Sequence, residues 1–212
     1  MDMRRIDPNC AAIVLAGGKS SRMGSSKALL PIDGEPLIVH IVRALRQLFD
    51  EIVIVGTAQV PLPALPEKLV CDEVPYQGPL AGLYYGLRAI SGQWSFICSC
   101  DAPFLDLSLV AHLVSCVQGY DVVVPFWEER FQPLSAVYRR ELIPVLKQQL
   151  TIGELRFARL YEKVPTRVVR EEELRRFDPE GLSFFNLNRP EDYHRALALW
   201  HKRGQLRGDL KP

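Results

Sequence analysis

Apolar and polar positions along this chain form alternating blocks that predict strands and helices in turn. Short apolar runs bounded by glycine, proline or charged residues are typical of buried strands. They cover residues 11–15, 52–55, 69–72, 94–98, 121–125, 132–138, 166–169 and 184–188. Apolar residues at three- and four-residue spacing are typical of helices. They cover residues 36–49, 80–90, 109–117, 141–150, 153–161 and a final helix that starts at Pro190.

This order of elements predicts the fold class and the domain organisation. Alternating strands and helices over residues 1–125 favour an α/β, three-layer, Rossmann-like fold, with a mostly parallel twisted sheet and helices on both faces. Residues 1–202 are expected to form one domain, followed by a flexible polar tail over residues 203–212. In such sheets, ligands bind beyond the carboxyl ends of the strands.

Polar residues near the element boundaries give more local expectations. Ser108 is expected to cap the helix that begins at Leu109, with His112 on the solvated side of that helix. Residues 126–131 are expected to be a connecting loop of unusual aromatic and charged composition, for which the sequence suggests no role. Residues 170–176 alternate acids and bases, as a solvated helical face does.

Charge and cysteine content narrow the function classes. Lys and Arg number 26 against 25 Asp and Glu, a net charge of +1, so no overall field favours nucleic acid or an anionic membrane. No apolar run reaches the ~18 residues of a membrane-spanning helix, and the amino end lacks the apolar core of a signal peptide. The five cysteines stand mostly in apolar segments, which favours buried thiols in a reducing compartment. We therefore expect a cytoplasmic protein.

The richest segment for chemistry is the loop over residues 15–31, which follows the first strand. Its glycines and cations are Gly17, Gly18, Gly24, Lys19, Arg22 and Lys27. Glycines let the backbone approach a ligand closely, and successive N–H groups then form an anion-binding concavity. Arg22 can bind phosphate oxygens through two parallel bonds, and Lys27 supplies a compact charge. The Walker A motif is excluded because position 13 is isoleucine, and the G-x-G-x-x-G fingerprint finds no match here.

Other marked features also follow strands, and the sheet is expected to bring them to the loop. They are Asp72, the Gly-rich segment 78–82 and Asp101. Mg²⁺ takes one or two protein carboxylates together with phosphate oxygens and water, so Asp101 facing a triphosphate predicts a Mg²⁺ ligand. The alternatives are that Asp101 caps the next turn, or that Cys98 and Cys100 form a thiolate metal site, a weak signal without further cysteines or histidines.

The remaining pattern of the loop, L-A-G-G-x-S-x-R-M-G-x-x-K-x-L-L-P, resembles the signature loop of the nucleotidyltransferases, and this resemblance implies transfer of a nucleotide to an acceptor phosphate. The acceptor would attack the α-phosphorus of a nucleoside triphosphate, and pyrophosphate would leave. Arg22 and Lys27 would stabilise the phosphates, and Mg²⁺ on Asp101 would polarise the α-phosphate. The backbone of residues 15–17 would hold the base and sugar.

Six motifs in this chain resemble, in the same order, those of the molybdenum cofactor guanylyltransferases within the nucleotidyltransferase superfamily. They are L-A-G-G-x-S-x-R-M-G-x-x-K (15–27), Asp72, G-P-L-A-G (78–82), C-x-C-D-x-P-F (98–104), Q-P-L-x-A-V-Y (132–138) and N-x-N-x-P-E-D (186–192). The resemblance runs from about residue 11 to 198.

The resemblance implies a nucleotide-diphospho-sugar transferase-like fold and transfer of GMP from Mg²⁺-bound GTP to the terminal phosphate of Mo-molybdopterin. It implies that GTP is bound by Leu15, Ala16, Gly17, Gly18, Lys27, Asp72 and Asp101, with Asp101 as the Mg²⁺ ligand. It places Asn186 and Asn188 on the pterin side, although both could instead hydrogen-bond buried backbone, or reach the metal through a carbonyl. Molybdoenzymes or their chaperones are the further partners that it implies.

Two positions depart from the family pattern. Arg189 stands where many relatives have threonine, and Gly56-Thr57 stands where an asparagine often lies near the base. The second departure leaves a cytidylyltransferase acting on the same pterin as one alternative. The remaining alternatives are another nucleotidyltransferase and a non-catalytic carrier of the finished pterin cofactor.

Overall fold

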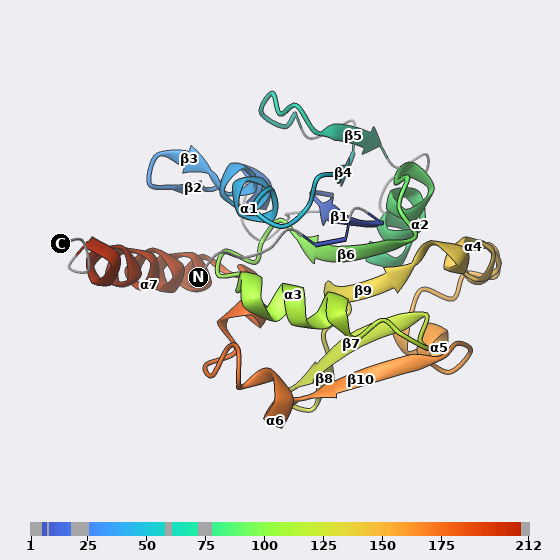
Figure 1. Cartoon of the computed structure of the whole chain (residues 1–212). Helices are drawn as coiled ribbons and strands as arrows, with labels where there is room; N and C mark the ends of the chain where they lie inside the picture. Colours follow the sequence, from blue (N-terminus) through green and yellow to red (C-terminus); the bar gives the residue numbers. More distant parts are fainter. Residues whose placement is uncertain (1–5, 8, 18–25, 58–60, 72–77, 209–212) are drawn as a thin grey trace.

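A mixed sheet of eight strands forms the centre of the molecule (Figure 1). The structure is a computed structural model, which describes residues 6–7, 9–17, 26–57, 61–71 and 78–208, with side chains up to residue 203. The strands are β1 (Cys10–Leu15), β4 (Ile52–Gly56), β5 (Lys68–Cys71), β6 (Trp94–Ser99), β7 (Val122–Trp127), β8 (Arg130–Phe131), β9 (Ser135–Arg139) and β10 (Thr166–Arg170). Outside the sheet, β2 (Pro31–Ile32) and β3 (Glu35–Pro36) form a small hairpin.

The sheet is mostly parallel, as the sequence predicts. Its order is β10-β7-β9-β6-β1-β4-β5, with β8 paired to β7. β1 is parallel to β4 and β6, β4 to β5, and β10 to β7, whereas β9 is antiparallel to both of its neighbours. The carboxyl ends of β1, β4 and β6 therefore lie together at one edge of the sheet.

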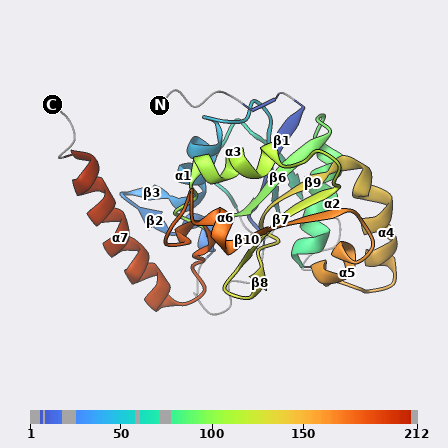
Figure 2. The ribbon, with the colours of Figure 1, turned by 60° about the horizontal axis from the view of Figure 1, so that its bottom comes forward.

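Helices cover both faces of the sheet (Figures 1 and 2). The helices are α1 (Leu37–Leu45), α2 (Pro79–Ala89), α3 (Leu107–Ser115), α4 (Ile143–Thr151), α5 (Phe157–Tyr161), α6 (Glu171–Leu174) and α7 (Pro190–Gly208), with short 3-10 turns η1 (Lys27–Leu29), η2 (Arg140–Leu142) and η3 (Leu182–Phe184). Successive strand residues point to opposite faces. Val14 accordingly packs in a core with residues of α1, α3 and α7, and Ile13 in a second core with residues of α2, α4 and α5. Within the described residues, no helix is long and apolar enough to cross a bilayer.

Two local predictions are wrong. Helix α3 begins at Leu107 and is capped by Asp106, whose Oδ1 accepts hydrogen bonds from the backbone of Ser108 (2.8 Å) and Leu109 (3.1 Å). Residues 126–131 are the end of β7, β8 and the tight turn that joins them, rather than an irregular loop.

Three further predictions need correction. Helix α5 occupies only the second half of the helix predicted over 153–161. Residues 184–188 form no strand, because Leu187 donates its backbone N–H to the carbonyl of Asp101 (3.0 Å) instead of to a strand. Helix α7 runs to Gly208, so the segment expected to be a tail begins inside a helix.

We predict that Gly86→Ala destabilises the fold although Gly86 lies inside α2. Alanine favours a helix interior by about 1 kcal/mol, but overpacking a core costs about 1–3 kcal/mol. A Cβ at Gly86 would lie 2.7 Å from Cγ2 of Ile13, so we expect a net loss of about 1 kcal/mol in a urea titration. Gly82→Ala is the matched control in the same helix. A Cβ at Gly82 would lie 3.0 Å from its nearest neighbour, a terminal methyl of Leu15, so it would be less crowded than a Cβ at Gly86. A higher free energy of unfolding for Gly86→Ala than for wild type would contradict the packing.

Candidate active site

The carboxyl ends of three adjacent strands define the candidate site. Leu15 pairs in register with Val55 on one side and with Ser99 on the other. Beyond the strands, Ala16 donates its N–H to the carbonyl of Val55 (2.8 Å), and Cys100 donates to the carbonyl of Leu15 (2.9 Å). The start of the Gly-rich loop is thereby fixed between the ends of β4 and β6.

Lys27, Asp101 and Asn188 meet at this edge. The ammonium nitrogen of Lys27 lies 2.7 Å from Oδ2 of Asp101 and 2.9 Å from Oδ1 of Asn188. The three residues come from η1, the turn after β6 and the segment before α7, separated by 74 and 161 positions along the chain. Asp101 is 8 % exposed. A buried carboxylate needs a charged partner, and Lys27 supplies it.

Asp101 is held through both its side chain and its backbone. Its carboxylate accepts the Lys27 bond, and its carbonyl accepts the N–H of Leu187 (3.0 Å). The following helix, α3, is capped by Asp106, so Asp101 does not cap it. The same contact to Leu187 fixes the segment that carries both candidate asparagines.

The two asparagines differ in what they contact. The amide nitrogen of Asn186 donates to the carbonyl of Phe184 (3.2 Å), which corresponds to the backbone-bonding alternative. Asn188 points its amide oxygen at Lys27, while its own N–H and that of Arg189 donate to Oδ2 of Asp192 (2.9 and 2.8 Å). Arg189 is exposed. Of the pair, Asn188 joins the candidate site directly.

The cysteines of this edge belong to the core. Cys98 and Cys100 are buried in the cluster that packs against α1 and α3. Burial raises the pKa of the Cys98 thiol to about 12 and raises that of Cys100 as well, and nearby Asp101 adds to both shifts. Such thiols are protonated at neutral pH and inert, as core cysteines are. The expectation of buried thiols is wrong for Cys71, which is exposed.

Several predicted site residues lie outside the residues that the structure describes. They are Gly18, Lys19, Arg22, Gly24 and Asp72. Of the other residues predicted to bind the nucleotide, Leu15 and Ala16 are buried at the end of β1, whereas Gly17 is exposed.

Thr57 is a polar residue at this edge that the sequence singled out only as a departure from a family pattern. It follows β4 and is 5 % exposed. Its hydroxyl oxygen has no hydrogen-bond partner among the described residues. Buried hydroxyls are normally paired, so an orphaned one beside a candidate site is a group available to a ligand.

Comparison with known proteins shows what this chain is similar to. A model of the MobA-like NTP transferase domain matches residues 12–168. A protein of Carboxydothermus hydrogenoformans named probable molybdenum cofactor guanylyltransferase is 34 % identical over 91 % of this chain and 97 % of its own. A Desulfosudis oleivorans protein named molybdenum cofactor guanylyltransferase is 32 % identical over 88 % of this chain and 93 % of its own.

Solved structures support the fold. Molybdopterin-guanine dinucleotide biosynthesis protein A from Archaeoglobus fulgidus superposes with a TM-score of 0.78 at 24 % identity, covering 91 % of this chain and 99 % of its own. The 2-C-methyl-D-erythritol 4-phosphate cytidylyltransferase from Thermus thermophilus gives a TM-score of 0.67 at 18 % identity, covering 89 % and 97 %. The fold is that of the nucleotidyltransferases, and the sheet and helices agree with the class predicted from the sequence.

Proposed function

This chain belongs to the MobA-like NTP transferase family, and from that membership we propose that it transfers GMP from GTP to the terminal phosphate of Mo-molybdopterin. An oxygen of the acceptor phosphate attacks the α-phosphorus of GTP. The bond from the α-phosphorus to the bridging oxygen breaks, pyrophosphate leaves, and a new phosphoanhydride joins GMP to the pterin. The proposal includes a cytoplasmic location and delivery of the product to molybdoenzymes or their chaperones.

The observation that carries the proposal is the meeting of Lys27, Asp101 and Asn188. Lys27 is a cation of the Gly-rich loop, Asp101 is the strand-end carboxylate, and Asn188 is one of the two asparagines that the family resemblance assigns to the pterin. A reaction between two phosphate-bearing substrates needs positioning and neutralisation of charge more than covalent chemistry. In the proposed complex, Lys27 turns from Asp101 to the phosphates and stabilises the leaving pyrophosphate.

The donor set at Asp101 suits Mg²⁺. One carboxylate oxygen and one amide oxygen lie 2.7 and 2.9 Å from a single cationic atom, the Lys27 nitrogen, so both already face a positive charge. Mg²⁺ prefers such hard oxygen ligands. We propose Asp101 as the protein ligand. When bound, Mg²⁺ supplies polarisation of the α-phosphate. Leu15, Ala16, Gly17 and Gly18, with Arg22 and Asp72, complete the proposed GTP contacts.

Thr57 offers a test of how the base is bound. Thr57→Val removes the orphaned hydroxyl and keeps the shape of the side chain, so we expect unchanged or higher stability. If the hydroxyl contacts the nucleotide, the affinity for GTP falls by about tenfold, equivalent to about 1.4 kcal/mol. Calorimetry with GTP on both proteins measures this. An unchanged GTP affinity would show that Thr57 does not contact the nucleotide.

Calorimetric titration with GTP, CTP, ATP and UTP, with and without Mg²⁺, separates the alternatives. The proposal predicts that GTP binds most tightly and that its binding strengthens with Mg²⁺. A preference for CTP would keep the fold and mechanism but assign the chain to cytidylyl transfer. Failure to bind any nucleotide would contradict an enzyme and favour the non-catalytic pterin carrier.

A further inference from the structure

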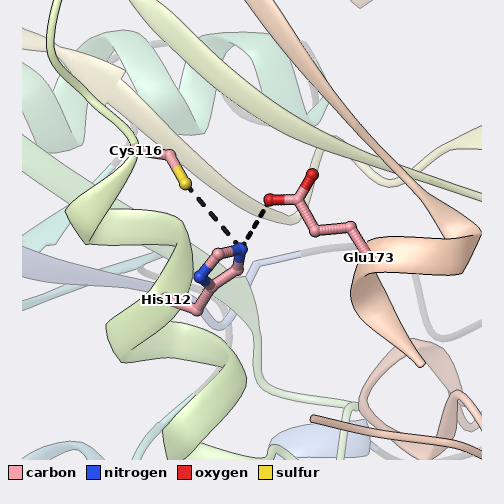
Figure 3. A group of neighbouring side chains, drawn as sticks. All are labelled: His112, Cys116 and Glu173. Atoms are coloured by element: carbon pink, nitrogen blue, oxygen red, sulfur yellow. Dashed lines mark hydrogen bonds and ion pairs between the residues drawn. The ribbon is translucent and has the colours of Figure 1, made fainter. Parts of the chain in front are cut away.

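A second group of polar side chains, His112, Cys116 and Glu173, lies between α3 and α6 (Figure 3). The Nε2 atom of His112 lies 2.8 Å from Oε1 of Glu173 and 3.8 Å from the sulfur of Cys116. One donor atom from each residue falls within 4.8 Å of the other two. The prediction that His112 is solvated is therefore wrong, since its side chain is 20 % exposed and faces Glu173.

The backbone positions this cluster independently of any ligand. His112 and Cys116 are four residues apart at the carboxyl end of α3, so their side chains lie on one helix face. Glu173 reaches them from α6, and the Phe177 ring stacks on the imidazole at 4.3 Å. The carboxyl end of a helix carries partial negative charge, which favours a cation there.

The charges around the cluster keep Glu173 ionised. Partial burial raises the pKa of Glu173, but hydrogen bonds from His112 and Arg167 outweigh it, and the net pKa is lowered. Arg167 of β10 donates to both carboxylate oxygens, at 3.0 and 3.3 Å. If one carboxylate oxygen of Glu173 binds a metal, the other can still accept a hydrogen bond from Arg167, as metal-bound carboxylates commonly do from an outer partner.

We propose that His112, Cys116 and Glu173 bind one Zn²⁺ ion, with solvent as the fourth ligand. Thiolate, imidazole and carboxylate are the ligands that Zn²⁺ takes, whereas Mg²⁺ avoids sulfur, so the site is chemically distinct from the oxygen pair at Asp101. Ligand atoms of a tetrahedral zinc site lie about 3.3–3.7 Å apart, given metal–ligand distances of about 2.0–2.3 Å. The Cys116–His112 pair already lies near that range at 3.8 Å, and the His112–Glu173 pair at 2.8 Å must open by about half an ångström.

The ion would join two parts of the chain that carry the candidate active site. Helix α3 follows the turn of Asp101, and α6 precedes the segment of Asn188. The three ligands are all partly exposed, so the ion can enter from solvent without unfolding. Because Zn²⁺ binds the folded form, it stabilises the protein against heat. Among the described residues, the hydrogen bonds of the three ligands do not involve Lys27, Asp101 or Asn188. The role that we assign to the ion is therefore structural.

Co²⁺ titration of the reduced, metal-free full-length protein tests this proposal, because Co²⁺ replaces Zn²⁺ and reports a thiolate ligand by a charge-transfer absorption band. The variants are Cys116→Ser, His112→Gln and Glu173→Gln, with Cys71→Ser as the matched control because Cys71 is an exposed thiol outside the cluster. We expect one equivalent of Co²⁺ to produce the band in wild type and Cys71→Ser, and Zn²⁺ to abolish it.

Loss of a single ligand should weaken the site strongly. We expect no band in Cys116→Ser and at least a tenfold weaker Co²⁺ affinity in His112→Gln and Glu173→Gln. Zn²⁺ should raise the melting temperature of wild type and Cys71→Ser but not of Cys116→Ser. No band in wild type, or an undiminished band in Cys116→Ser, would overturn the proposal and leave the cluster as an ion-pair network around Glu173. Because no nucleotide is present, either result is independent of the proposed GMP transfer.

Discussion

Replacing Asp101 with asparagine lowers the rate of GMP transfer by about 100-fold or more, the scale of losing one electrostatic stabiliser of a transition state. The change removes the negative charge but keeps the size of the side chain, and the backbone bond from Leu187 does not depend on it. Steady-state release of pyrophosphate from GTP and Mo-molybdopterin measures the rate, and pterin binding should survive.

Asp106→Asn is the matched control for this prediction. Asp106 lies in the same connection between β6 and α3 and caps α3, and asparagine caps a helix about as well as aspartate. Its turnover and stability should stay near wild type. If Asp101→Asn also kept turnover within a few-fold of wild type, Asp101 would be only a structural partner of Lys27.

Replacing Lys27 with methionine lowers turnover by more than tenfold. A charge-assisted hydrogen bond contributes about 1.5–3 kcal/mol, and 1.4 kcal/mol corresponds to a factor of about ten in rate. If Lys27 acts on the leaving pyrophosphate, kcat falls more than the affinity for GTP does. Pre-steady-state and steady-state assays with GTP separate the two effects.

Lys68→Met controls for the loss of one lysine. Lys68 is the first residue of β5, at the amino ends of the parallel strands and so away from the candidate site. It donates to the carbonyl of Ala89 (2.9 Å). We expect wild-type turnover from it. The double variant Lys27→Met/Asp101→Asn should be less impaired than the sum of its single effects, because the two side chains are in contact at 2.7 Å. Strict additivity would contradict a shared role.

The part of the site that sequence reasoning predicted depends on one rule of sheet topology. Leu15 and Asp101 are far apart in the chain, but Leu15 ends one buried apolar strand and Asp101 follows another, and parallel strands end at one edge. Asn188 could not be placed in this way. Its segment is apolar and looks like a strand, yet its backbone bonds to the turn of Asp101, so only the family resemblance assigned it to the site.

The errors have local physical causes. The turn between β7 and β8 has two glutamates with positive φ, at 47° and 59°, whereas such hairpin turns are usually recognised by asparagine or glycine. His112 was misplaced because helical periodicity describes one helix at a time. The arrival of Glu173 from α6 is a tertiary contact between residues 61 positions apart, which no pattern within α3 reports.

Formation of the guanine dinucleotide cofactor from GTP and Mo-molybdopterin, set against the same assay with CTP, tests the proposed function most directly. We expect one pyrophosphate released for each guanine dinucleotide formed, a much slower reaction with CTP, and loss of product in Asp101→Asn. A faster reaction with CTP, or product formation unaffected by Asp101→Asn, would contradict the assignment of guanylyl transfer to this site.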